Sequence, residues 1–161
     1  MTRHAQVRSD HTRSKLAPSA LTLLESARQR LAAGERDTSA ASRYVAAHLA
    51  ALRAAAAVVA AKSEPGVSGR RKRPRNVWEL LPRAEPALSG WAAHFAAIAG
   101  ARGRLGLGRT KAVSRRQADR LLGDAEAFVS LAEDTLGVTA QPQRHVAQDR
   151  PSVTLPRPKL P

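Results

Sequence analysis

Residues 40–59 read AASRYVAAHLAALRAAAAVV, and this alanine-rich stretch decides the fold. Alanine has the highest intrinsic helix propensity, and Pro65-Gly66 ends the segment. Asp37 can accept hydrogen bonds from the first free amides, so we predict a helix over about 38–62. Positions spaced three and four residues apart predict its buried stripe. They are Val45, His48, Leu49, Leu52, Ala56 and Val59.

Two further long helices are predicted, one before this segment and one near the end of the chain. Pro18 suits the first turn of a helix over about 18–33, which Gly34 is expected to end. Residues 115–136 form the last helix, because Ser114 and Gln117 match a capping box and Gly137 is a natural stop. In each segment apolar residues recur at helical spacing.

The region between the helix at 38–62 and the last helix predicts a broken helix. A short turn at about 77–81 precedes Pro82, and the main segment runs over about 86–101 with Trp91 and Phe95 on one side. No segment shows sustained period-two alternation. The predicted fold class is therefore all-α, an antiparallel four-helix bundle.

The size of the chain predicts one domain with two tails. Of 161 residues, we assign 1–16 to a disordered basic arm, 17–137 to the helical domain and 138–161 to a disordered Pro-rich tail. Aromatic residues make up only 3%, so alanine, leucine and valine must fill the core and the helices should approach closely.

The residue inventory excludes several classes of protein. Without cysteine there is no disulfide, thiolate metal site or cysteine nucleophile. No charge-free apolar run reaches the roughly 18 residues of a membrane span, and no signal peptide is visible, so we expect a cytoplasmic protein without a membrane partner. Residues 103–108 match no dinucleotide or Walker pattern, and the acids of the last helix have no histidine near them in sequence. We predict no cofactor and no metal.

The net charge of +14 admits two interpretations. Arginine supplies 22 of the 27 cations, which reflects either a GC-rich genome or a polyanionic partner, most simply nucleic acid. The two long interhelical regions are the basic ones: residues 63–83 carry +4 and residues 102–120 carry +6. Trp78, beside the first cationic run, is either a base-stacking residue or a core anchor. The candidate phosphate-binding residues are Arg70, Arg71, Lys72, Arg73, Arg75, Arg104, Arg109 and Lys111.

Arg43 and His48 are the candidate catalytic residues. Their spacing resembles the Arg-x(4–6)-His motif of the HEPN (higher eukaryotes and prokaryotes nucleotide-binding) superfamily. The surrounding residues 43–58 look like a small actinobacterial HEPN family, and residues 125–132 are similar to its last helix. The resemblance covers about residues 17–137.

This resemblance implies a function and an assembly. In ribonuclease members the motif histidine takes part in acid–base cleavage and the arginine steadies the phosphate charge. Carried over, His48 would transfer the proton and Arg43 would stabilise the phosphate, without a metal and often at a homodimer interface. The resemblance implies an RNA-binding protein and, for an active member, a toxin-like endoribonuclease with an antitoxin protein partner.

A non-catalytic module that binds nucleic acid or a protein is the alternative. Five residues of helix separate Arg43 and His48 by about 140° around the axis. His48 would then be an interior or dimer-interface residue rather than a catalyst.

Overall fold

The structure, a computed structural model, describes residues 16–63, 76–105 and 112–138, with the backbone alone for 102–105. These residues form five α-helices and one short 3-10 helix and contain no strand, which confirms the all-α prediction. The elements are α2 (Pro18–Arg36), α3 (Ala40–Lys62), α4 (Val77–Ala84), η1 (Pro86–Leu88), α5 (Ser89–Leu105) and α6 (Arg115–Thr135). Most of the predicted arm, most of the tail and the run at 70–75 lie outside these residues.

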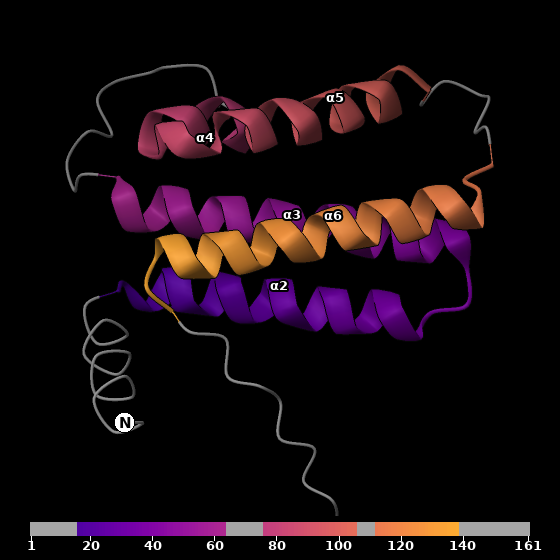
Figure 1. The fold of residues 1–161 in the computed structure, drawn as a ribbon, viewed down its shortest axis with the longest axis horizontal. Coiled ribbons are helices and arrows are strands. Elements are labelled where there is room, and N and C mark those ends of the chain that lie inside the picture. The colour runs from indigo at the N-terminus through magenta and orange to yellow at the C-terminus, as the bar shows by residue number, and fades with distance from the viewer. Residues whose placement is uncertain (1–15, 64–75, 106–111, 139–161) are drawn as a thin grey trace, which may run out of the picture.

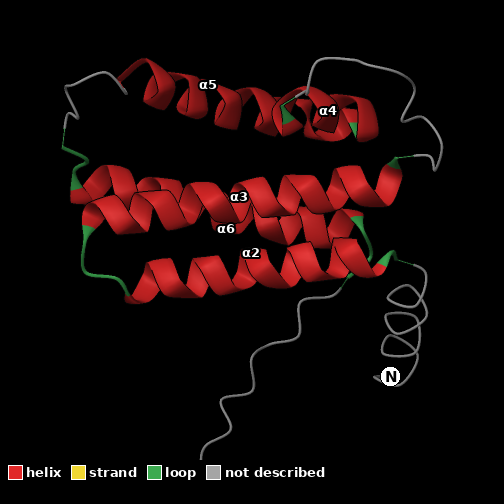
Figure 2. Ribbon diagram, turned by 180° about the vertical axis from the view of Figure 1, so that it is seen from behind, coloured by secondary structure: helices red, strands yellow, loops and turns green. Residues whose placement is uncertain are grey.

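The helices are arranged in two layers. Helices α2, α3 and α6 lie side by side, and α4 with α5 covers one edge of this group (Figure 1). Consecutive long helices alternate in direction, and the view from behind places α3 between α2 and the α4–α5 layer (Figure 2). Helix α3 packs most extensively, against α2 and α6, so it is the centre of the bundle.

The buried face of α3 differs from the predicted one. The six positions expected to form the buried stripe, including His48, are only partly buried. The buried residues are Ala47, Ala50, Ala51, Ala54, Ala55, Ala57 and Val58. The alanines of α3 face α2 and α6. Because their side chains are small, these helices can approach α3 closely, whereas larger side chains would hold them apart.

The ends of α2 and α3 also correct the sequence prediction. Gly34 does not end α2; it is a buried residue inside the helix, which continues to Arg36. Ser39, not Asp37, is the N-cap of α3, since its hydroxyl accepts from the Ser42 amide at 3.3 Å. The Asp37 carboxylate instead accepts from the Ser39 amide at 2.9 Å and stabilises the turn before the helix.

The predicted ends of α6 are correct. The Ser114 hydroxyl accepts from the Gln117 amide, and the Gln117 side chain accepts from the Ser114 amide, which completes the capping box. Gly137 follows the helix with φ of 67°, a conformation that favours glycine. In α4 the helix passes through Pro82 to Ala84 rather than ending before it.

An aromatic cluster joins the α4–α5 layer to α6. Trp78 is 4% exposed and stacks on Phe95, with ring centroids 5.2 Å apart. Phe128 of α6 lies 5.4 Å from Phe95 and 5.7 Å from Trp91. Trp78 is therefore part of the core, and its ring is not available to stack on a base.

Helix α3 is also the one helix of the described ranges that is long and apolar enough to cross a membrane. The core helix of a bundle has the same composition, and α3 packs against α2, α4 and α6. It also carries Arg43 and Arg53. Its length and composition alone are weak evidence for a membrane span.

Candidate functional site

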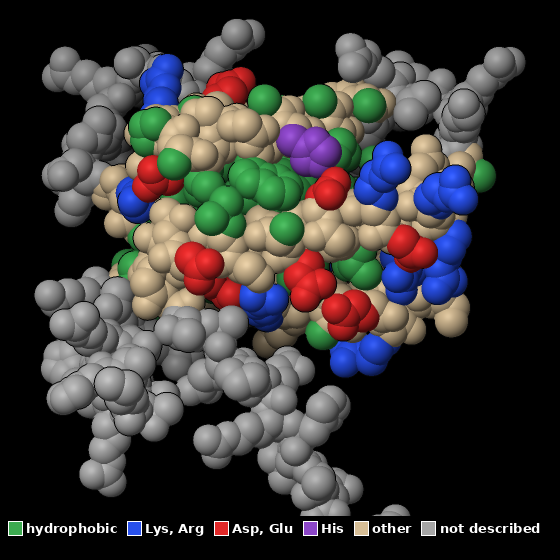
Figure 3. Space-filling view, viewed as in Figure 1, with side chains coloured by type: hydrophobic (Ala, Val, Ile, Leu, Met, Phe, Trp, Pro, Cys, Tyr) green, Lys and Arg blue, Asp and Glu red, His purple; other side chains and the backbone are tan. Residues whose placement is uncertain are grey.

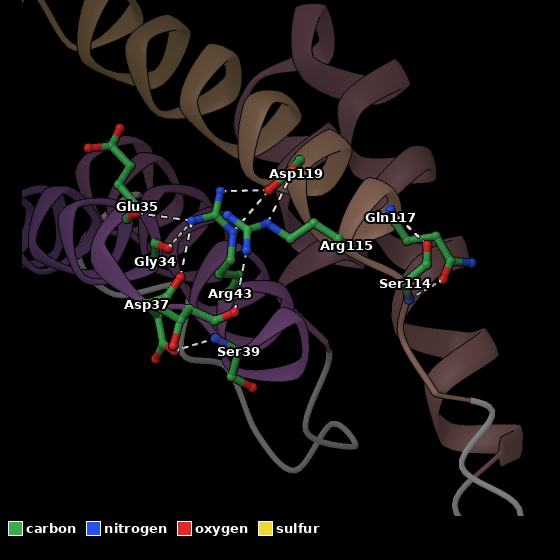
Figure 4. A network of polar contacts seen from close by, with 10 residues as sticks. Gly34, Glu35, Asp37, Ser39, Arg43, Ser114, Arg115, Gln117 and Asp119 are labelled. Carbon is green, nitrogen blue, oxygen red and sulfur yellow. Dashed lines mark hydrogen bonds and ion pairs between the residues drawn. The ribbon is translucent and has the colours of Figure 1, made fainter.

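Arg43 lies in the first turns of α3, where one edge of its guanidinium contacts the end of α2. Its Nη1 donates to the backbone carbonyls of Gly34 at 2.9 Å, Glu35 at 3.0 Å and Asp37 at 3.3 Å (Figure 4). The last carbonyls of a helix have no partner within the helix. Arg43 satisfies two of them in α2, those of Gly34 and Glu35, and its side chain is only 11% exposed.

The other edge of the Arg43 guanidinium contacts α6. Its Nε and Nη2 both donate to one carboxylate oxygen, Oδ1 of Asp119, at 3.0 and 2.6 Å (Figure 4). The Nε of Arg115, one turn earlier in α6, lies 3.6 Å from the same carboxylate. Asp119 thus stands between two arginines, and Arg43 joins α2, α3 and α6.

His48 is not part of this network. It follows Arg43 by five residues in α3, which corresponds to about 7.5 Å along the axis and about 140° around it. The hydrogen bonds of Arg43 go to α2, the following turn and Asp119, and none goes to His48. His48 itself is partly buried. Within one subunit no hydrogen bond of Arg43 therefore joins the two motif residues.

The comparison with known families bears on the same residues. The family model described as HEPN_SAV_6107-like HEPN matches residues 32–133, more than half of the chain. The chain belongs to the HEPN family. The match contains Arg43, His48 and Asp119. No curated protein and no solved structure matches this chain.

Most of the predicted phosphate-binding residues of this HEPN protein lie outside the described residues. Arg104 is in the last turn of α5, where the backbone alone is described. The other seven are Arg70, Arg71, Lys72, Arg73, Arg75, Arg109 and Lys111. The segments that contain them connect α3 to α4 and α5 to α6, and the ends of α3 and α5 lie at opposite ends of the molecule (Figure 1).

Charge is divided unevenly between the described residues of the HEPN protein and the rest of the chain, which comprises the two connecting segments and both ends. The described residues contain 12 cations and 10 acids, a net charge of +2. The remaining residues contain the other 15 cations and only 3 acids, a net charge of +12. On the fold itself, exposed cations gather where α6 begins (Figure 3). They are Arg115, Arg116 and Arg120.

Sequence reasoning missed the partners of Arg43. In the structure Asp119 of α6 pairs with Arg43, and Glu133 of the same helix pairs with Arg28. Asp119 lies 76 positions from Arg43, so no local pattern could have connected them. Among the described residues, no three histidine, cysteine or acidic side chains converge to hold a metal.

Proposed function

We propose that this HEPN protein binds RNA through the basic segments that adjoin its helices. The uneven division of charge carries the proposal: a nearly neutral fold adjoins segments in which cations outnumber acids five to one. Clustered lysine and arginine bind phosphates by releasing counterions, and every further phosphate contact makes binding more sensitive to salt.

In a single subunit, the geometry favours RNA binding without RNA cleavage. Arg43 donates to three carbonyls and to one carboxylate, so its donors are engaged while Asp119 faces it. A guanidinium that stabilises a transition state must have donors directed at the reacting phosphate. In the proposed role, Arg43 mainly holds the fold together.

A toxin-like, metal-independent ribonuclease is the second candidate. The spacing of Arg43 and His48, inside the region that matches the family, favours it. An imidazole titrates near neutral pH and can move the proton of an RNA 2′-hydroxyl. In this candidate the cognate antitoxin is a separate protein.

We also propose that the protein is a homodimer. Helix α3 has an outward row of partly buried apolar residues beside His48, which includes Val45, Leu49 and Ala56. A second copy on this row would cover apolar surface and place two His48 side chains near one interface. Sedimentation of the full chain as a dimer, and as a monomer after Leu49→Glu, would support this arrangement.

Binding is tested by anisotropy with labelled oligo(U) between about 50 and 200 mM salt. Affinity should fall steeply with salt. Replacing Arg71, Lys72 and Arg73 with alanine should reduce the slope of log affinity against log salt concentration by the equivalent of about three phosphate contacts. Three exposed arginines of the fold are the charge-matched control: Arg30, Arg53 and Arg83. Equal losses in both triple variants would argue against the segment as the contact.

Cleavage is tested with the same RNA in EDTA. Degradation by the wild type that disappears in His48→Ala would establish the ribonuclease. If both proteins leave the RNA intact, the function is binding alone. Equal degradation by both would remove His48 as the catalyst.

A further inference from the structure

The two edges of the Arg43 guanidinium have different surroundings. The Nη1 edge is held by three backbone carbonyls at the end of α2. Among the described residues, the Nε–Nη2 edge donates to the Asp119 carboxylate alone, and both donors reach its Oδ1. Backbone carbonyls are fixed by the fold, whereas a side chain on a helix surface can change rotamer. The first edge is therefore an anchor, and the second is directed at a replaceable group.

The replaceable edge has the geometry that binds phosphate. Two parallel N–H groups of an arginine match two oxygens of a carboxylate or a phosphate equally well. Asp119 is 47% exposed and is also contacted by the exposed Arg115. Its carboxylate thus occupies the point between two guanidiniums where a phosphate oxygen would be bound.

We propose that Asp119 is an internal competitor for phosphate and masks an RNA-phosphate site made by Arg43 and Arg115. When the Asp119 side chain turns outward, a phosphate takes its place on the Nε–Nη2 edge of Arg43. The carbonyl contacts keep the guanidinium in position during the exchange. Arg116 and Arg120, exposed on the same turns of α6, raise the local positive potential. This inference rests on the proposed RNA binding.

The first test compares RNA affinities of full-length variants. Asp119→Ala should bind oligo(U) about five- to tenfold more tightly, because a charge-assisted contact is released. Asp134→Ala removes an exposed acid of the same helix and should gain about twofold or less. In an Arg43→Lys background the cation remains but the paired donors are lost, so the gain from Asp119→Ala should disappear.

Two results would overturn this proposal: a gain from Asp119→Ala no larger than that from Asp134→Ala, or a gain that persists with Arg43→Lys. If Asp119→Ala melts below the assay temperature, Asp119→Asn removes the charge and keeps the shape.

The second test does not depend on RNA. Inorganic phosphate, compared with chloride at equal ionic strength, should raise the Tm of Asp119→Ala and leave that of the wild type nearly unchanged. Equal phosphate responses in the two proteins would refute a masked site. If the wild type fails to bind RNA but Asp119→Ala still responds to phosphate, the proposed function fails and the masked anion site stands.

Discussion

Arg28 of α2 and Glu133 of α6 form a two-point ion pair between the first and last helices of the bundle. The Arg28 Nε donates to the Glu133 carboxylate at 2.8 Å, and its Nη2 donates to the second carboxylate oxygen and to Ser130 Oγ at 3.1 Å. Glu133 is 4% exposed, so this arginine compensates a buried charge. The hydrogen bond with Glu133 raises the pKa of Arg28, which keeps the guanidinium charged.

Removing Arg28 should destabilise the fold strongly. Arg28→Ala leaves the Glu133 carboxylate buried without its cation, which costs about 3 kcal/mol or more for fully buried pairs. The Arg28 side chain is 31% exposed, so we expect about 2 to 3 kcal/mol in urea unfolding. Arg30→Ala, an exposed change in the same helix, should stay within about 0.5 kcal/mol. Similar losses from both would show that the pair contributes little.

Gly34 is closely approached by its neighbours, in contrast to Gly123. A Cβ at Gly34 would lie 3.0 Å from Leu122 Cδ1 and 3.2 Å from Ala46 Cβ, where α2, α3 and α6 meet. Overpacking of this kind costs about 1 to 3 kcal/mol and outweighs the helix-propensity gain of about 1 kcal/mol. Gly34→Ala should therefore lower the Tm.

The matched control is Gly123→Ala in α6, where nothing lies within 4 Å of the added Cβ. It should raise the free energy of unfolding by up to about 1 kcal/mol, because alanine favours the helix more than glycine does. Stabilisation by both substitutions would mean that the helices are further apart at Gly34 than the structure indicates.

Local sequence signals predicted the elements better than their contacts. The helices, the Ser114–Gln117 capping box and the Gly137 stop depend on residues within a few positions of one another. The buried face of α3 could not be predicted this way. A periodicity count favours the larger apolar side chains, whereas α2 and α6 pack on the alanines, which allow the closest approach.

The candidate site shows the same limit. The spacing of Arg43 and His48 identified a family that the comparison bears out. The spacing did not reveal that the Arg43 guanidinium is bound by α2 carbonyls and by Asp119, because these partners come from other elements. The prediction that Gly34 ends α2 is wrong for a related reason. Its close neighbours, Ala46 and Leu122, are not adjacent to it in sequence.

The capping box of α6 should contribute more stability than the cap of α3. Ser114 accepts at 3.1 Å and its own amide is satisfied by Gln117, whereas Ser39 accepts at a longer 3.3 Å. Ser114→Ala should therefore cost about 1 to 2 kcal/mol in urea unfolding, and Ser39→Ala about 0.5 kcal/mol. A larger loss at Ser39 would reverse this order and contradict the reciprocal cap.

The ion pair between Lys62 and Glu85 should make stability depend on acid pH. The hydrogen bond from Lys62 lowers the pKa of Glu85 below its ordinary value near 4.5. A lowered folded-state pKa gives stability that is present above the ordinary glutamate range and is lost as pH falls through the folded value. The Tm advantage of the wild type over Glu85→Gln at pH 7 and low salt should therefore shrink below about pH 4. Glu79→Gln, an exposed change in α4, is the control, and an advantage unchanged to pH 3 would refute the pair's role.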